Sequence, residues 1–339
     1  MPRVQKKTAR LSDVARLSQV SPGLVSRIVN HDPTLKIRDE TRDRVNEAIS
    51  LLNYTPHASA RALRNSRTGL LGFVLHHVND PVYADMVASA QSAAAAHDYS
   101  VMLVDAGGLA ERREAFRELV HGRRVDGLLI QSGFEWSDFA LHEFADTLPS
   151  VLFNAEPSSG LRTVRLDDAR AAALATAHLI ELGHSAIAFV GADGSSSERR
   201  YQGYLTAMHS AGRVPLPVIP GGWDSDESHT AIRNYYGSGG EATGLVAVTS
   251  TVALGAHSGL AASGLTIPND VSLISIHDTW FARHLTPALT AVSLPLARLG
   301  EIAVAMLVSQ LDSENVGETV ITDPPPDVII RGSTAPARR

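Results

Sequence analysis

The chain has 339 residues, 44% of them apolar and 19% charged, which is the composition of an ordinary globular protein with room for more than one domain. It has no cysteine, which excludes disulfides, thiolate nucleophiles and thiolate metal ligands. It also lacks the roughly 18 to 20 consecutive apolar residues of a membrane helix and the apolar core of a signal peptide, so we expect a cytoplasmic protein.

The net charge of −6 is divided unevenly along the chain. Residues 1–67 hold 13 Lys and Arg against 6 Asp and Glu, so this segment carries +7 and the rest of the chain −13. A basic head attracts phosphate groups, whereas an acidic body is repelled by them. The pattern favours a protein that binds nucleic acid through its N-terminal segment, although a merely solvated basic segment would have the same composition.

The N-terminal segment is predicted to form three short helices. The first takes Ser12 as its N-cap and ends near Ser18. The second takes Ser21 as its N-cap, has Pro22 at the first helical position, where a missing N–H costs nothing, and runs to about residue 30. In the third, apolar residues recur at the spacing of one helical face: Val45, Ala48, Ile49 and Leu52. Three short helices around one small core indicate a helix-turn-helix unit.

The next stretch, 56–64, has a helix-forming composition but few apolar residues to bury. Isolated helices of this length are marginal in water. We therefore predict a hinge that is helical only when another molecule supports it.

From residue 70 the pattern changes to short apolar strands that alternate with helices, which predicts parallel sheets covered by helices. Strands are predicted at 70–75, 101–104, 127–130, 151–153, 186–190, 245–248 and 273–276, and helices at 83–97, 112–120, 169–182, 197–211 and 251–262. Two such series imply two lobes. Ligands of open α/β sheets bind beyond the carboxyl ends of the strands, so we expect a ligand in the cleft between the lobes.

A set of distinct short motifs is spread along nearly the whole chain. Two long ones, LSDVARLS at 11–18 and VSPGLVSRIVN at 20–30, lie in the predicted helix-turn-helix. The others are ETR (40–42), LNYTP (52–56), ARAL (60–63), TGLLG (68–72), VDGL (125–128), LIELGH (179–184), PNDVSL (268–273) and RGST (331–334). Together they resemble the LacI/GalR family of bacterial transcription regulators, the lactose-repressor type.

The resemblance implies an α/β protein with an N-terminal all-α helix-turn-helix domain and a two-lobed, periplasmic-binding-protein-like domain, in which two parallel sheets are flanked by helices. It implies a headpiece at 1–55, a hinge at 56–68, an effector-binding and dimerisation domain at 69–332 and a tail at 333–339. The first lobe is expected at about 69–166 and 293–320, and the second at about 167–292 and 321–332.

The resemblance also implies a function. Family members bind pseudo-palindromic operator DNA as homodimers or tetramers, and an effector between the lobes changes their affinity. We expect a repressor that binds double-stranded operator DNA under the control of a sugar, a sugar phosphate or a related metabolite.

The DNA-contacting residues follow from the resemblance and from helix geometry. Pro22 and Gly23 occupy positions where family members carry base-reading side chains, yet neither has a side-chain donor. We therefore expect Arg27 to read O6 and N7 of a guanine in the major groove, with a phosphate contact as the alternative. Leu24 replaces the usual threonine, so the operator sequence is not predictable. The expected DNA contacts are Ser12, Ser21, Pro22, Gly23, Leu24, Ser26, Arg27, Asn30, Tyr54, His57, Ala60, Arg61 and Leu63.

The hinge is expected to shape the operator. Leu63 matches the family leucine that wedges into the minor groove at the operator centre, and Ala60 matches a small residue facing that groove. An apolar wedge partly unstacks a base step and kinks the duplex, which lets two hinge helices pack together. Leu63 thus contributes without donating a hydrogen bond.

The expected effector contacts are Val82, Tyr83, Asn154, Ser195, Arg199, Trp223, Thr249, His277 and Leu294. Arg199 is expected to bind the ligand through two N–H groups of its guanidinium, with a structural salt bridge as the alternative. Tyr83 and Trp223 are expected to stack on a ring of the ligand, with core packing as the alternative. His277 stands where sugar-binding members commonly have an aspartate. A buried hydroxyl without an acceptor is costly, so we expect no simple hexose, and His277 with Arg199 suggests a phosphorylated or carboxylated ligand.

Other functions find less support in the sequence. The histidines lack the spacing of metal ligands, Ser195 lacks a Gly-x-Ser-x-Gly elbow, and no phosphate-binding loop is present. We therefore expect no enzyme, no metal and no cofactor. Two alternatives stay open: a two-lobed solute-binding protein of the same fold, and a regulator whose cleft binds no effector.

Overall fold

The computed structural model describes residues 9–30, 32–54, 67–106, 113–131, 147–156, 161–311 and 317–338. The chain divides into two compact units, residues 1–68 and 69–339. Most of the predicted hinge, including His57, Ala60, Arg61 and Leu63, lies outside the described residues.

The first unit contains three helices in its described part: α1 (Leu11–Ser18), α2 (Pro22–Val29) and α3 (Asp39–Leu51). Ser21 caps α2 as predicted, because its side chain accepts a hydrogen bond from the Leu24 N–H at 3.3 Å. The predicted cap of α1 is wrong. That helix begins after Arg10, whose N–H donates to the Asp13 carboxylate at 2.9 Å, and Ser12 lies inside the first turn. The helices enclose Val14, Ala15, Val25, Ile28, Val45, Ala48 and Tyr54.

The second unit has two lobes, each built on a six-stranded sheet within the described residues. In the first lobe all strands are parallel, in the order β11-β5-β4-β3-β1-β2. These are β1 (Leu70–Leu75), β2 (Ser100–Asp105), β3 (Gly127–Gln131), β4 (Ser150–Phe153), β5 (Arg162–Leu166) and β11 (Glu318–Ile321). The helical segments of this lobe are η1 (Pro81–Tyr83), α5 (Ala84–Ala95), α6 (Arg113–His121) and α12 (Leu296–Gln310).

The second lobe has the strand order β12-β10-β9-β8-β6-β7 and is parallel except for β12. Its strands are β6 (Ile187–Gly191), β7 (Ile219–Pro220), β8 (Gly244–Ala247), β9 (Ser272–Ile276), β10 (Thr290–Ser293) and β12 (Asp327–Ile329). Its helices are α8 (Asp168–Glu181), α9 (Ser195–Ser210), α10 (Ser225–Gly237), α11 (Ser250–Ala262) and η3 (Ala282–His284). The predicted α/β architecture with two helix-flanked sheets is confirmed.

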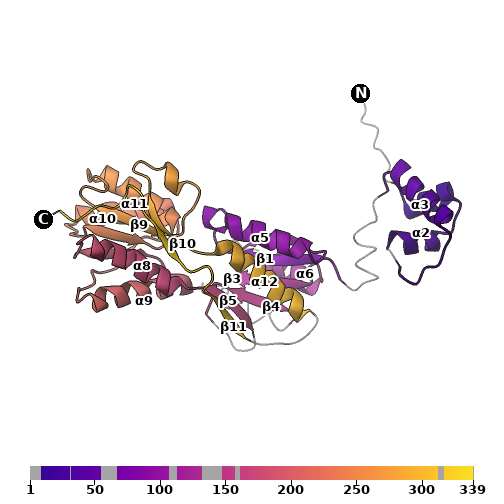
Figure 1. Cartoon of the computed structure of the whole chain (residues 1–339), viewed down its shortest axis with the longest axis horizontal. Coiled ribbons are helices and arrows are strands. Elements are labelled where there is room, and N and C mark those ends of the chain that lie inside the picture. Colours follow the sequence, from indigo (N-terminus) through magenta and orange to yellow (C-terminus); the bar gives the residue numbers. More distant parts are fainter. Residues whose placement is uncertain are drawn as a thin grey trace, which may run out of the picture. The chain divides into compact units, whose positions relative to one another are not determined.

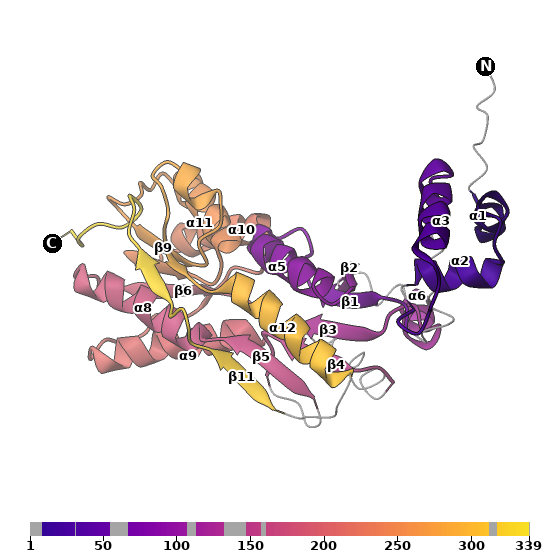
Figure 2. The same cartoon turned by 45° about the vertical axis from the view of Figure 1, so that its right-hand side comes forward.

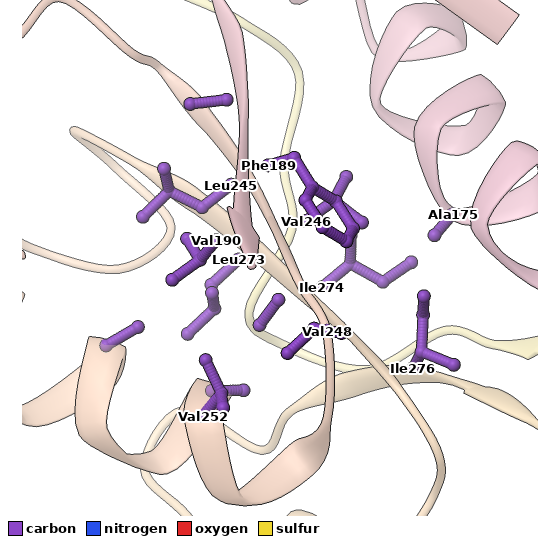
Figure 3. Close-up of a cluster of buried hydrophobic side chains, with 14 of the residues drawn as sticks. Ala175, Phe189, Val190, Leu245, Val246, Val248, Val252, Leu273, Ile274 and Ile276 are labelled. Carbon is purple, nitrogen blue, oxygen red and sulfur yellow. The ribbon is translucent and has the colours of Figure 1, made fainter. Parts of the chain in front are cut away.

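The second lobe has an apolar core on both faces of its sheet (Figure 3). Successive strand residues point to opposite faces, so Phe189 lies towards Ala175 of α8 while Val190 lies towards Val252 of α11. Neighbouring strands repeat this alternation with Leu245, Val246, Leu273 and Ile274. Strands buried on both faces explain the nearly continuous apolar runs in the sequence.

The chain passes between the lobes more than once. Figures 1 and 2 show α12, drawn in gold late in the chain, beside α5 of the first lobe. The chain then returns through β12 to the second lobe. The expected tail, 333–339, packs against the second lobe at its first residue. Ser333 is fully buried, donates to the Leu273 carbonyl at 2.6 Å and accepts from the Thr290 N–H at 2.8 Å.

In the described part of the chain, three helix pairs approach closely at a glycine: α8 with α9, α5 with α12, and α10 with α11 at Gly255. A Cβ on Gly203 of α9 would overlap the backbone carbonyl of Ala169 at the start of α8, and a Cβ on Gly300 of α12 would overlap the Met86 carbonyl of α5. Backbone atoms cannot rotate away as side-chain ends can. Each helix pair must therefore separate if a side chain is added.

We predict that Gly203→Ala lowers the free energy of unfolding by about 1–3 kcal/mol, because α8 and α9 must move apart. Urea unfolding of the full chain, followed by far-UV circular dichroism, measures the change. Gly237→Ala is the control: this exposed glycine ends α10 with no atom near its added Cβ, so we expect a change within about 1 kcal/mol. Equal urea midpoints for Gly203→Ala and the wild type would show that the helices tolerate the methyl group.

Candidate functional site

The helix predicted to read DNA is α2. Ser21, Pro22, Gly23 and Arg27 are exposed on it, whereas Ser26 and Leu24 are half-buried. The Arg27 side chain is 45% exposed, and its Nε donates to Asp32 at 2.7 Å while Nη2 donates to the Thr34 hydroxyl at 3.0 Å. Its guanidinium is therefore accessible but held in one direction.

Two other expected DNA contacts have structural partners. Asn30 donates from its side chain to the Ser26 carbonyl of its own helix. Tyr54 lies in the core of the headpiece and is 8% exposed. Ser12 is exposed on α1. The described surface thus leaves Arg27 as the large exposed base-reading candidate on α2.

A small cavity lies between the two lobes of the second unit. Its volume is about 20 Å³, which holds about one water molecule. Six predicted residues line it: Val82, Tyr83, Asn154, Trp223, Thr249 and His277. Polar residues that the sequence analysis missed also line it: Asp80, Gln131, Ser196 and Arg200.

Three predicted contacts do not line the cavity. Ser195, Arg199 and Leu294 are each replaced there by a residue one or two positions later: Ser196, Arg200 and Leu296. For Ser195 and Arg199 on α9 the cause is helix geometry: successive helical residues point about 100° apart, so a shift of one position turns the side chain away from the cavity.

Arg200 is the buried cation of the cavity. It is 1% exposed and donates to the Asp168 carboxylate, the Val248 carbonyl and His277 Nε2, at 2.8, 2.7 and 2.8 Å. Because an arginine only donates, Nε2 is the acceptor and the imidazole is neutral with its proton on Nδ1. Burial, together with the nearby Arg200 charge, lowers the pKa of His277 well below its usual value.

Arg199 joins the two lobes. It donates to Asp168 of the second lobe at 2.6 Å through Nη2, and across the cleft to Glu156 at 2.7 Å and the Asn154 side chain at 3.0 Å. Arg199 thus forms the structural salt bridges that were the alternative to ligand binding. Burial raises the pKa of the Asp168 carboxyl, but Arg200 and Arg199 outweigh it and hold that pKa below its usual value.

A second contact joins the lobes on the Asp80 side. The Thr251 hydroxyl at the start of α11 donates to the Asp80 carboxylate at 2.8 Å, and the Val82 N–H donates to the same oxygen at 3.0 Å. Burial raises the pKa of Asp80. Tyr83 accepts from Gln131 at 2.8 Å, and burial raises its pKa to about 12. The cavity wall is thus a set of mutually bonded polar groups.

Three residues at the ends of strands adopt a left-handed backbone conformation. His77 follows β1, Asn154 follows β4 and His277 follows β9, with φ of 54°, 47° and 72°. Side chains other than glycine adopt this region only at a cost, and such residues concentrate at binding sites. Two of the three, Asn154 and His277, line the cavity.

No described helix is long and apolar enough to cross a membrane. No group of three or more His, Asp or Glu in the described part of the chain is arranged to hold a metal ion.

Comparison with known proteins identifies the family. The model of bacterial regulatory proteins of the lacI family matches residues 10–57, and that of a periplasmic binding protein-like domain matches residues 176–334. The PurR transcriptional repressor of Erwinia tasmaniensis is 30% identical over 96% of this chain and 97% of its own length. This chain belongs to the LacI family of bacterial regulatory proteins.

Other relatives of this LacI-family chain agree. The ribose operon repressor of Haemophilus influenzae is 29% identical over 93% of this chain and 96% of its own length. The structure of a LacI family regulator from Mycobacterium smegmatis is 35% identical, covers 78% of this chain and 99% of its own, and has a TM-score of 0.73. The lac repressor dimer bound to operator is 24% identical over 97% of this chain and 100% of its own, and its TM-score of 0.84 supports the fold.

The comparisons confirm the family predicted from the sequence motifs and a DNA-binding transcription regulator as its function. The ribose operon and PurR repressors among its relatives are regulators of transcription, which points away from an enzyme. The DNA and effector contacts assigned to single residues stay predictions.

We predict that Asp168→Asn lowers the free energy of unfolding of this LacI-family protein by about 3–5 kcal/mol, because two buried guanidinium groups lose their shared carboxylate. Urea unfolding measures the loss. Glu301→Gln is the control, since it breaks an exposed ion pair with Arg298 that contributes at most about 1 kcal/mol. If the two variants unfolded at the same urea concentration, the fold would not depend on the ion pairs of Asp168 with Arg199 and Arg200.

Proposed function

We propose that this LacI-family regulator is a repressor that binds operator DNA as a homodimer through α2, and that a small polar metabolite between its lobes changes its affinity for the operator. The repressors of the ribose operon and of the PurR type among its relatives support this assignment. In this role the protein is not an enzyme and acts in the cytoplasm.

Two contacts across the cleft give the main support for this proposal. Arg199 reaches Asn154 and Glu156 on one side of the cavity, and Thr251 reaches Asp80 on the other. Both contacts must break or lengthen when the lobes separate. A ligand that prefers either arrangement therefore shifts the balance between two states, as a regulated repressor requires.

The charges in the cleft favour a neutral polar effector over the phosphorylated or carboxylated one suggested by the sequence. Arg199 and Arg200 already share Asp168, and the neutral His277 brings no positive charge. An anionic ligand would have to compete with that carboxylate. Hydroxyl groups, in contrast, can use the donors and acceptors of Gln131, Asn154 and Ser196 without displacing a charge.

A regulator without an effector is the second candidate. The cavity of about 20 Å³ and the mutually bonded groups around it favour this alternative. A ligand the size of a sugar requires a pocket of roughly 300 Å³ or more, so its binding demands an opening of the lobes.

We predict that neutral sugars raise the thermal unfolding midpoint of the full chain and that their phosphorylated analogues do not. A ligand at about 100 times its Kd adds about 2.7 kcal/mol. Calorimetry then compares Ser196→Ala, which removes a hydroxyl that lines the cavity, with Ser92→Ala, an exposed control on α5: the first weakens binding and the second does not. Stabilisation by sugar phosphates alone contradicts the neutral class, and a flat screen supports the regulator without an effector.

We predict that Arg27→Ala loses about 1–3 kcal/mol of discrimination for one guanine, about 5- to 150-fold. Fluorescence anisotropy with a duplex selected from a random pool, and with the same duplex carrying adenine at that position, measures the loss. If Arg27 contacted phosphate alone, the variant would weaken both duplexes equally and reduce the salt dependence by about one unit of slope. A solute-binding protein of the same fold would bind neither duplex.

A further inference from the structure

Arg27 belongs to a closed ring of hydrogen bonds at the end of α2. Its Nε donates to Asp32 Oδ2 at 2.7 Å and its Nη2 donates to Thr34 Oγ1 at 3.0 Å. The Thr34 hydroxyl in turn donates to Asp32 Oδ1 at 2.7 Å. Three side chains thus fix one another, and one of them is the arginine expected to read the operator.

The carboxylate in this ring is itself fixed to the backbone. The Asp32 N–H donates to the Arg27 carbonyl at 3.0 Å, and the Thr34 N–H donates to Asp32 Oδ1 at 2.9 Å. Hydrogen bonds from Arg27 and then from Thr34 lower the pKa of Asp32 to about 2, so it is ionised wherever DNA binding is measured. Asp32 is therefore an anion at a set place beside α2.

The ring leaves part of the guanidinium free for DNA. An arginine has five N–H groups, and Asp32 and Thr34 take one on Nε and one on Nη2. Among the described residues none accepts from Nη1. A hydrogen on Nη1 and the second one on Nη2 point away from the chain as a parallel pair, which matches O6 and N7 of a guanine.

We propose that Asp32 and Thr34 are positioning residues that aim the Arg27 guanidinium at a guanine and thereby sharpen the operator specificity of this regulator. The proposal rests on the role of Arg27 as the base reader. An arginine that is already ordered in the free protein loses less conformational freedom when it binds. Pro22 and Gly23 supply no side-chain donor on the same helix, so the direction of this one side chain carries much of the readout.

Masking of Arg27 by Asp32 is the opposite interpretation, and the geometry disfavours it. In a mask the carboxylate would cover the end of the guanidinium that faces DNA. Here it bonds to Nε, on the side nearest the chain, and the Arg27 side chain stays 45% exposed. The two interpretations predict opposite effects of removing the Asp32 charge.

The test measures binding of the full-length protein to the selected duplex and to duplexes in which the guanine read by Arg27 is replaced by adenine or by 7-deazaguanine. Asp32→Asn keeps an acceptor for the turn but loses the carboxylate, and Thr34→Val removes the hydroxyl link. We expect both variants to lose about two- to tenfold of the preference for guanine, while keeping or gaining affinity for unrelated DNA. Glu47→Gln, which removes one negative charge from an exposed site of α3, is the control and keeps the preference.

The Arg27→Ala background separates the possible failures. If Asp32 acts through Arg27, Asp32→Asn has no further effect on the preference once Arg27 is absent. If Arg27→Ala loses the preference but Asp32→Asn does not, the positioning role is wrong while base reading by Arg27 stands. If Arg27→Ala keeps the preference, both assignments fail. Tighter operator binding by Asp32→Asn with an unchanged preference supports the mask and overturns the proposal.

Discussion

The architecture of the second unit, residues 69–339, depends on one buried carboxylate, that of Asp168. It lies in the first turn of α8, is almost inaccessible to water and accepts hydrogen bonds from both Arg199 and Arg200 of α9. An uncompensated charge cannot remain in such a place, so the two helices are held in one arrangement. From that anchor Arg200 turns towards His277 in the cavity, and Arg199 turns across the cleft to the first lobe.

The anchor and the hydrogen bonds across the cleft break at different costs. Asp168, Arg199 and Arg200 all belong to the second lobe, so their ion pairs can persist when the lobes separate. Separation breaks the bonds from Arg199 to Glu156 and Asn154, and the bond from Thr251 to Asp80. The Glu156 side chain is 57% exposed, and ion pairs with exposed partners contribute little. A small ligand can therefore drive the lobes apart, whereas disruption of the anchor amounts to unfolding.

Periodicity and capping were sufficient to predict the main architecture, and they were insufficient for the site. The strands buried on both faces and the α2 cap at Ser21 follow from local sequence. Short strands with polar residues, such as β5 and β10, are not predictable from the sequence, because hydrogen bonds to neighbouring strands rather than a local apolar pattern create them. In the run SSSERR no local property distinguishes Arg199 from Arg200. Only the tertiary structure separates them, because Arg200 reaches His277 inside the second lobe while Arg199 reaches Glu156 of the first lobe.

Both units use a carboxylate to orient arginine, and the surroundings decide what the pair achieves. Asp168 is buried, so removing it leaves two cations without compensation and the fold suffers. Asp32 lies at the surface, where an ion pair adds little to stability because water screens it. What such a pair retains is direction: Thr34 and the backbone hold the carboxylate, and the carboxylate holds the guanidinium. In the proposed role of α2, Pro22 and Gly23 supply no base-reading side chain, so the direction of Arg27 would matter more for specificity than the strength of its ion pair does for folding.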